Sequence, residues 1–540
     1  MNPSFLQGMT RTRVEATLPE FLKRQRWFGG KARDLTAAHI VDAIPISSPE
    51  TDTVLLLIDV TYGDGGQDTY VLPVTSAFGE EAVRISHDIP RAVLSRLTAD
   101  ETRHGREGVL YDAVWESAAM HGLLRAMGEG VQFDGEAGSL RTASTSVYQT
   151  IVPSDVPLTV RVLSSDQSNT SVAFRERALL KLYRRVQPGV NPDWEIGRYL
   201  TARAFPHTAA VGGAIEYVRS GETTTVGLLQ AFVRNEGDAW AATLKELDRF
   251  LTRVDEHTSP VDSEAGKDRS LWNLAHQPLA DADRQLLGPA LVMAACLGER
   301  TAALHLTLGQ ADGNPDFMPE PLTPEYRRIR QESMLQMWKQ VLRLMRQRSA
   351  QGNPAQSEVE QLLARESTVV AVFQAFRDVH EGGLRIRCHG DYHLGQVLYT
   401  GSDYIVTDFE GEPARPLHER RQKHSPLYDV AGMLRSFDYA SWTALANWMQ
   451  NDHSRELELW ATYWSRWVRA QFLGAYLTHV RDASFWPASL KDAELLLTVH
   501  QLEKAVYELG YELNNRPEWV GIPLKGIKEI VRMSGTRAAA

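Results

Sequence analysis

Apolar residues follow two different patterns along the chain, and the change comes near residue 234. In the first part, short apolar or alternating runs predict strands; these runs cover residues 53–60, 69–74, 158–163, 170–174, 178–183 and 227–233. Helix-like stretches at 18–27 and 109–127 interrupt them. In the second part, apolar residues recur at steps of three and four and predict helices; these cover 240–254, 290–308, 324–348, 357–377, 427–439, 456–480 and 491–514. The pattern therefore predicts an α+β protein whose strands precede a mainly helical part.

The length of the chain predicts more than one domain, because 540 residues exceed the size at which a single core keeps growing. We expect three segments. Residues 1–90 form a small strand-rich unit around the turn signal at 63–66, residues 91–233 complete a second strand-rich unit, and residues 234–540 form the helical part.

The segment 388–396, CHGDYHLGQ, carries the strongest chemical signal, together with Asp408, which follows it by twelve residues. Phosphoryl transfer to a hydroxyl needs one carboxylate to accept the proton, and a second carboxylate and an amide to hold Mg²⁺ on the phosphates. Asp391, Gln396 and Asp408 have the order and spacing that kinase-like folds use for these groups. We therefore predict Asp391 as the catalytic base and Gln396 and Asp408 as metal ligands.

Two features of this motif depart from the protein-kinase form. Gln396 stands where protein kinases carry Asn, and the triplet at 408–410 reads DFE. Both departures keep a metal-binding oxygen. Strand-like runs at 396–399 and 404–407 flank the turn residues Gly401, Ser402 and Asp403, so we predict a hairpin that brings both ligands to one end.

A lysine within the apolar run 178–183 is the predicted anchor for nucleotide phosphates. Lys181 needs partners among its apolar neighbours, and kinases pair such a lysine with ATP phosphates and with a Glu of the next helix. Asn191 and Pro192 predict the start of that helix, with Glu195 in its first turn. We predict a Lys181–Glu195 pair; the alternative is a glutamate held only by the helix dipole.

The remaining residues of the predicted ATP site come from two connections. The polar loop 164–169 precedes the strand of Lys181 and is predicted to cover the phosphates with Ser168, Asn169 and Thr170, although a polar turn is the alternative. Gln230, Phe232 and Val233 lie where the hinge to the helical part is expected, and we assign them to ATP as well.

Four segments closely resemble bacterial maltokinases, which belong with the aminoglycoside-phosphotransferase-like kinases and occur alone or fused behind trehalose synthase. The segments are DFEGEP at 408–413, DVAGMLRSFDY at 429–439, RWFGGKAR at 26–33 and LEKAVYEL at 502–509. The resemblance spans nearly the whole chain. It implies a bilobal fold like that of eukaryotic protein kinases and aminoglycoside phosphotransferases, with residues 1–90 as an N-terminal β-rich cap, 91–233 as the nucleotide-binding lobe and 234–540 as the catalytic lobe.

The same resemblance implies the reaction and the partners. Maltose is phosphorylated by ATP with Mg²⁺ at its anomeric C1 hydroxyl, giving maltose 1-phosphate and ADP on the route from trehalose to glycogen. Trehalose synthase is the implied protein partner or fusion.

The predicted helix 491–514 carries the implied sugar contacts. Its leucines and valines form one stripe, while Lys504, Tyr507, Glu508 and Tyr511 fall on the opposite side. The resemblance implies that Lys504, Tyr507 and Glu508 hold maltose, and we add His389 from the catalytic segment. Periodicity alone also fits a solvated face with an ion pair between positions 504 and 508.

A second possible sugar site comprises Lys423, Tyr428 and Asp429, which follow the metal-binding segment.

Composition excludes several classes of protein. A formal net charge of -10 argues against a nucleic-acid-binding protein, and two distant cysteines, Cys296 and Cys388, suggest neither a disulfide framework nor a cysteine metal site. The first residues lack the pattern of a cleaved signal, and no run approaches ~18 consecutive apolar residues. We therefore expect no nucleic-acid partner, no membrane and a cytoplasmic location.

Two alternatives stay open at this point. One is a kinase of the same fold for another sugar, such as glucosamine. The other is a catalytically silent module that binds nucleotide or acts as a scaffold for trehalose synthase; the joint presence of Lys181, Asp391, Gln396 and Asp408 argues against it.

Overall fold

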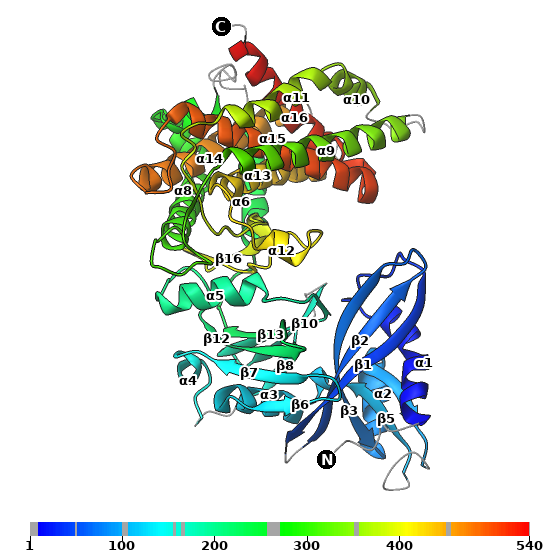
Figure 1. Cartoon of the computed structure of the whole chain (residues 1–540). Coiled ribbons are helices and arrows are strands. Elements are labelled where there is room, and N and C mark those ends of the chain that lie inside the picture. Colours follow the sequence, from blue (N-terminus) through cyan, green and yellow to red (C-terminus); the bar gives the residue numbers. More distant parts are fainter. Residues whose placement is uncertain are drawn as a thin grey trace. The chain divides into compact units, whose positions relative to one another are not determined.

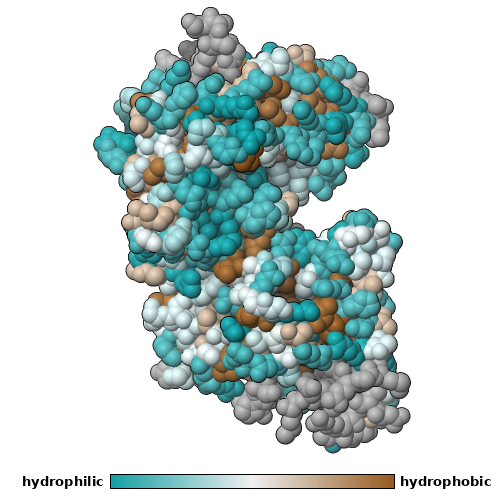
Figure 2. All heavy atoms as spheres, viewed as in Figure 1, coloured by the Kyte–Doolittle hydropathy of each residue, from teal (hydrophilic) through white to brown (hydrophobic). Residues whose placement is uncertain are grey.

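The computed structural model describes residues 9–48, 51–99, 106–154, 158–163, 168–255, 270–349, 356–449 and 455–538. The chain forms two compact units (Figure 1). Unit 1 is Met1–Arg234 with Arg415–His418, and unit 2 is Asn235–Ala414 with Glu419–Ala540. On the face in view in Figure 2, hydrophilic residues cover most of each unit and hydrophobic residues lie in small separate groups.

The first sheet of unit 1 is antiparallel and has the order β1-β2-β3-β5-β4. Its strands are β1 (Leu35–Ser48), β2 (Thr51–Tyr62), β3 (Gln67–Phe78), β4 (Val93–Leu97) and β5 (Gly108–Asp112), and the short β11 (Arg185–Val186) pairs with β3. The helices α1 (Met9–Arg24) and α2 (Glu80–Asp88) pack on it. The boundary expected at residue 90 therefore lies inside this sheet, which continues to Asp112.

The segment 26–33 builds part of the core of this sheet. Trp27 and Phe28 are buried and pack against the ring of Tyr70, at 6.0 and 5.1 Å between ring centroids. A Cβ at Gly30 would lie 2.4 Å from the hydroxyl of Tyr62, so only glycine fits there. The motif is thus a packing element in this unit.

The second sheet of unit 1 is also antiparallel, with the order β6-β7-β12-β13-β10-β9-β8. Its strands are β6 (Gln132–Asp134), β7 (Ser139–Ser144), β8 (Val160–Val162), β9 (Asn169–Phe174), β10 (Ala178–Tyr183), β12 (Val211–Arg219) and β13 (Glu222–Ala231). The helices α3 (Ser117–Glu129), α4 (Tyr148–Ile151) and α5 (Pro192–Ala202) pack on it. The predicted helix over 109–127 is wrong at its start, because Gly108–Asp112 is the fully buried strand β5.

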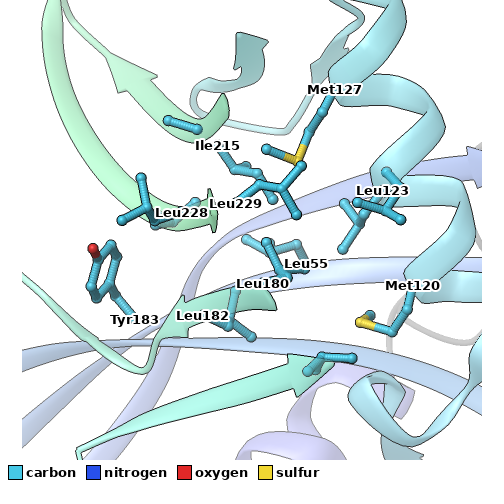
Figure 3. Close-up of a cluster of buried hydrophobic side chains, with 14 of the residues drawn as sticks. Leu55, Met120, Leu123, Met127, Leu180, Leu182, Tyr183, Ile215, Leu228 and Leu229 are labelled. Carbon is cyan, nitrogen blue, oxygen red and sulfur yellow. The ribbon is translucent and has the colours of Figure 1, made fainter. Parts of the chain in front are cut away.

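One hydrophobic core joins the two sheets of unit 1. Leu55 of β2 belongs to the same buried cluster as Leu123 of α3, Leu180 of β10 and Leu228 of β13 (Figure 3). Because the cluster draws side chains from both sheets, the strand-rich segments expected as separate domains share a core.

Unit 2 is mainly helical, as predicted. Its longer helices are α6 (Ala239–Asp255), α8 (Asp281–Leu308), α9 (Pro324–Ser349), α10 (Gln356–Leu363), α11 (Glu366–Gln374), α13 (Leu427–Met449), α14 (Arg455–Val480), α15 (Leu490–Asn515) and α16 (Gly521–Ala538). The helix predicted over 357–377 is divided between α10 and α11, α13 runs ten residues beyond its predicted end at 439, and α16 was not predicted. The helix α13 packs against α14, α15 and α16.

Helix α8 is long and apolar enough to cross a membrane, judged by length and composition among the described residues. Half of its most apolar window is buried, and it packs along α14, so closely that a Cβ at Gly298 would lie 2.3 Å from the carbonyl oxygen of Phe472. A core helix of a folded unit can be equally long and apolar, and the packing against α14 accounts for the buried half of this window.

The predicted hairpin is present in unit 2. The strands β16 (Val397–Tyr399) and β17 (Tyr404–Val406) pair antiparallel around the turn at 401–403, with Val397 opposite Val406. This register brings the two ends of the hairpin that carry Gln396 and Thr407 together.

Candidate active site

The catalytic segment is held in place by the first turn of α13. The carboxylate of Asp429 accepts hydrogen bonds from the backbone N–H groups of His389, at 2.7 Å, and Gly390, at 3.0 Å. It also lies 3.1 Å from Nε2 of His305. Burial alone would raise the pKa of Asp429, but these partners outweigh burial and lower it. A buried, charged Asp429 therefore fixes the loop that carries Asp391.

His389 ties this loop to the end of β17 and does not reach the sugar-sized cleft described below. Its Nε2 contacts the carbonyl oxygen of Thr407 at 2.9 Å, its Nδ1 faces the backbone N–H of Asp391 at 3.4 Å, and the residue is 1% exposed. The assignment of His389 to the substrate is therefore corrected: its ring nitrogens serve the backbone, and it positions Asp391 relative to Asp408.

Asp391 forms an ion pair with the predicted sugar-binding lysine. Lys504 Nζ lies 3.0 Å from Oδ1 of Asp391, and His393 Nε2 lies 3.8 Å from Oδ2. Burial would raise the pKa of Asp391, but the ammonium of Lys504 and then His393 outweigh it, so the pKa is lowered. Asp391 is accordingly a carboxylate at neutral pH, the form a general base requires.

The predicted metal ligands lie at one end of the hairpin. The backbone N–H of Thr407 donates to the carbonyl oxygen of Gln396 at 3.0 Å, which sets Gln396 beside the residue that precedes Asp408. Asp408 has a φ of 65°, a left-handed conformation that a non-glycine residue rarely adopts and that is common at functional sites. Carboxylate oxygens of Asp408 and Glu410 lie within 4.8 Å of one another.

Oxygen ligands from two carboxylates and an amide suit Mg²⁺. Gln396, Asp408 and Glu410 therefore fit the ion that the motif implies. Glu410 was not assigned from the sequence, where it was noted only as a departure from glycine.

The face of α15 that carries Lys504 is not a solvated surface. Lys504 Nζ also lies 3.7 Å from Glu412, and the hydroxyl of Tyr507 donates to Glu412 at 2.6 Å. Glu508 accepts from Arg435 of α13, with Nε at 2.9 Å and Nη2 at 2.8 Å. The solvated-face alternative is thus excluded for these side chains, which contact the segments 408–412 and α13.

These side chains line a cleft of about 640 Å³ in unit 2, within the size range of small-molecule sites. The predicted residues that it brings together are Asp391, Lys504, Tyr507 and Glu508. Tyr511, which the sequence places on the same face of the helix, also lines the cleft. The cleft residues that the sequence did not single out include Trp240, Glu412, Tyr439, Glu512, Arg516 and Trp519.

The alternative sugar residues Lys423, Tyr428 and Asp429 are each held by contacts with other residues of unit 2. Lys423 is 7% exposed and donates to Glu320 at 2.7 Å and to the carbonyl oxygen of Pro315 at 2.9 Å. The ring of Tyr428 stacks on His424 at 4.9 Å. Because Asp429 anchors the catalytic segment, this group does not form a second sugar site.

The predicted phosphate lysine of unit 1 pairs with a carboxylate at the start of α5. Lys181 Nζ lies 3.0 Å from Asp193, which also accepts from the hydroxyl of Tyr183 at 3.0 Å. Asn191 caps this helix through its side chain, as predicted. Glu195 is buried in the same turn, and its pairing with Lys181 stays a prediction; Asp193 is the partner that the sequence did not identify.

The other predicted nucleotide residues lie in or next to two inner strands of the second sheet, β9 and β13. Ser168 is exposed, whereas Asn169 and Thr170 are buried in β9; the rest of the predicted loop, 164–167, lies outside the described residues. Thr170 Oγ1 accepts from Arg184 Nε at 2.8 Å, so its side chain has a structural role.

The predicted hinge residues are all half-buried, and they are Gln230, Phe232 and Val233. Gln230 lies in β13 opposite Leu179, and the backbone N–H of Phe232 donates to the carbonyl oxygen of Arg177 at 2.9 Å. Their contact with nucleotide stays a prediction.

Residues 21–115 match the family described as the maltokinase N-terminal cap domain. The match ends close to the end of the first sheet of unit 1, at Asp112.

Glucosamine kinases are similar to the chain in sequence and in fold. The enzyme of Mycolicibacterium smegmatis is 25% identical over 371 residues, which are 67% of this chain and 77% of that protein. The enzyme of Streptacidiphilus jiangxiensis is 30% identical over 167 residues, 31% of this chain and 36% of that protein. The solved structure of a glucosamine kinase in complex with glucosamine, ADP and inorganic phosphate matches with a TM-score of 0.60 and 17% identity, and covers 95% of this chain and 98% of that one.

The chain thus carries a maltokinase-type cap, and its fold is that of the glucosamine kinases. The predicted resemblance and the predicted α+β, kinase-like fold with a β-rich cap are confirmed. The comparisons support a phosphotransferase of the sugar-kinase type and do not separate maltose from glucosamine as its acceptor.

Proposed function

We propose that this chain, with its maltokinase-type cap on a sugar-kinase fold, transfers the γ-phosphoryl group of ATP to the anomeric C1 hydroxyl of maltose, giving maltose 1-phosphate and ADP. The observation that carries the proposal is the length and the lining of the cleft beside Asp391. Ionised side chains surround Asp391, and aromatic side chains extend the cleft along α15.

The length of the cleft favours an acceptor of more than one ring. Lys504 and Tyr511 are both cleft residues of α15 and are seven positions apart, which corresponds to about 10.5 Å along a helix. Tyr439, Tyr511 and Trp519 supply aromatic planes for the apolar faces of sugar rings. A single ring would leave part of this lining without contact.

The proposed reaction uses the geometry of the catalytic segment. The C1 oxygen attacks the γ-phosphorus while the bond to the bridging oxygen breaks and ADP leaves. Asp391 accepts the proton of the C1 hydroxyl, because its carboxylate is charged and lies in the cleft. Gln396, Asp408 and Glu410 would hold Mg²⁺, which would neutralise charge on the phosphates. Lys181 of unit 1 is assigned to the ATP phosphates, which its positive charge would stabilise.

Glucosamine is the second candidate acceptor. Glucosamine kinases match in sequence and fold, and the cleft contains the carboxylates of Glu412, Glu508 and Glu512, which would attract an ammonium group. Lys504 and Arg516 in the same cleft offset part of this charge.

Phosphorus NMR with ATP, Mg²⁺ and each of maltose, glucose and glucosamine tests the proposal. We expect ADP and a sugar phosphomonoester from maltose, with phosphorus coupled to the anomeric proton, and no product from the Asp391→Asn variant. Turnover of glucosamine alone would favour the second candidate. Absence of turnover with every sugar, in protein that binds ATP, would favour the silent module.

The proposal extends to the setting of the reaction. We place the reaction in the cytoplasm, where ATP is present, and propose a trehalose synthase, as partner or fusion, as the enzyme that supplies the maltose. Fractionation of cells and co-purification with a trehalose synthase test these two points.

A further inference from the structure

A second cavity, of about 360 Å³, lies among α13, α14 and α16 of unit 2. Its lining is rich in basic side chains, which are Arg435, Arg466, Arg469, Lys525 and Arg532. Two carboxylates, Asp438 and Glu529, and the hydroxyls of Ser441, Thr462 and Ser465 complete the polar lining, together with the ring of Trp442. We call this the α13–α16 pocket.

The α13–α16 pocket lies on the other side of α13 from the sugar-sized cleft. Ser436, Tyr439 and Thr443 of this helix line the cleft, whereas Arg435 and Trp442 line the pocket. Neighbouring positions on a helix point about 100° apart, so α13 forms a shared wall. The pocket is therefore distinct from the proposed active site and adjacent to it.

One buried cation in the pocket lacks a full set of partners. Arg469 is 7% exposed, and its Nη1 and Nη2 donate to Asp438 at 2.8 Å and to Gln501 at 3.2 Å. Its Nε is buried and has no hydrogen-bond partner within the described part of the chain. Arg469 Nη1 also lies 3.7 Å from Glu529 of the pocket. A buried donor of a charged group is costly to leave unpaired, so Arg469 is a lining residue with unused capacity to donate.

A second buried cation connects the pocket to the cleft. Arg435 is 1% exposed and donates from Nη1 to Asp438 at 2.9 Å, within the pocket. Its Nε and Nη2 donate to Glu508 of the cleft. Gly526 of α16 allows this placement, because a Cβ there would lie 2.2 Å from Nη1 of Arg435. A charged ligand in the pocket would thus act on the guanidinium of Arg435, which also holds Glu508.

The mixture of groups indicates the class of ligand. Guanidinium groups suit the oxygens of a phosphate ester. The hydroxyls and carboxylates of the lining suit sugar hydroxyls. Lys525 Nζ lies over the ring of Trp442 at 3.6 Å, so this ring holds one of the basic groups of the lining in place. Inorganic phosphate would use only the guanidinium groups.

We propose that the α13–α16 pocket binds a phosphorylated sugar and that its occupancy weakens sugar binding in the cleft through Arg435. The phosphate shares the guanidinium of Arg435 with Glu508, which leaves that carboxylate less firmly held. The coupling rests on the proposed function of the cleft, whereas the binding itself does not.

Calorimetric titration of the full chain with glucose 1-phosphate tests the binding without turnover. We expect binding that weakens tenfold or more in the double variant Arg466→Ala, Arg532→Ala, and that tightens in Glu529→Gln, which removes a carboxylate from the pocket. Lys528→Ala is the matched control, because Lys528 lies on the same helix and contacts Gln361 outside the pocket. Equal affinities of the double variant and the wild type, or equal affinities for glucose 1-phosphate and inorganic phosphate, would overturn the proposed site.

Steady-state kinetics with and without glucose 1-phosphate test the coupling. We expect the apparent KM of the sugar to rise about fivefold or more in the wild type and in Lys528→Ala, within the usual range of coupling between sites. The double variant should show wild-type kinetics without the ligand and no rise with it. A rise that persists in the double variant would mean that glucose 1-phosphate acts in the cleft, and the coupling would be wrong. If no sugar is turned over, the titration still decides the binding.

Discussion

Lys504→Met removes the positive charge nearest to the proposed catalytic base and keeps most of the side-chain volume. Lys504 Nζ lies 3.0 Å from Asp391 and 3.7 Å from Glu412, and both Lys504 and Asp391 are mostly buried. The variant separates two roles for the lysine, a contact with the sugar and a counter-ion for the base.

The magnitude follows from these distances. At an effective dielectric constant of about 20, unit charges 3.0 Å apart attract by about 5.5 kcal/mol, and at 3.7 Å by about 4.5 kcal/mol. Desolvation of the ions offsets much of this, and breaking a buried pair typically costs about 3–5 kcal/mol. If the substitution removes only about 1.4 kcal/mol of transition-state stabilisation, kcat/KM falls about tenfold.

The pH dependence gives the clearer test. Burial raises the pKa of Asp391 and Lys504 lowers it, so the pKa rises when Lys504 is removed. The acid limb of kcat/KM should therefore move to higher pH in Lys504→Met, with activity partly recovered at alkaline pH. Lys491→Met is the control, since Lys491 is an exposed residue of the same helix. A variant with an unchanged acid limb and only a raised sugar KM would refute the counter-ion role and leave Lys504 as a sugar contact.

Three further predictions concern the reaction and the acceptor. Asp391→Asn should lower kcat by about 10² or more, while calorimetry shows little change in maltose affinity; a variant with most of its turnover would exclude Asp391 as the base. Asp408→Asn should raise the Mg²⁺ concentration for half-maximal rate more than Gln396→Ala does, with Glu410→Gln between them, because a carboxylate neutralises the ion and an amide does not; the reverse order in Mg²⁺ titrations would contradict the ligand set. Trp519→Ala should raise the KM of maltose about tenfold, for a contact worth ~1.4 kcal/mol, and leave that of glucose nearly unchanged; equal effects on both sugars would mean that Trp519 does not face a second ring.

The catalytic motif could be interpreted from the sequence because its groups lie close together along the chain. Asp391, Gln396 and Asp408 are joined by one short hairpin, whose register follows from alternating strands and a turn. Partners from distant segments gave no such signal. Glu412 meets Tyr507 across 95 positions, and Asp429 reaches the catalytic segment from a helix.

Secondary structure was misjudged where local pattern and tertiary packing disagree. The strand β5 is a short run buried on both faces, which periodicity does not distinguish from a helix. Helix α16 contains Gly521, Pro523 and Gly526, which disfavour helix. At Gly526 the absent side chain leaves room for Arg435, so packing explains a residue that propensity counts against the helix. His389 was misplaced for a related reason: two residues from Asp391, it points to the backbone and not to the cleft.

The cleft-lining face of α15 has a consequence for altering the choice of acceptor. Its residues Lys504, Glu508 and Glu512 recur every fourth position, so each of them lies about 6 Å farther along the helix than the one before. Lys504, the first of the three, is the one that contacts Asp391. Each position along this face of α15 therefore corresponds to a different distance from the proposed site of phosphoryl transfer. Substitutions at its far end would change how long an oligosaccharide fits, while the chemistry at its near end stays as it is.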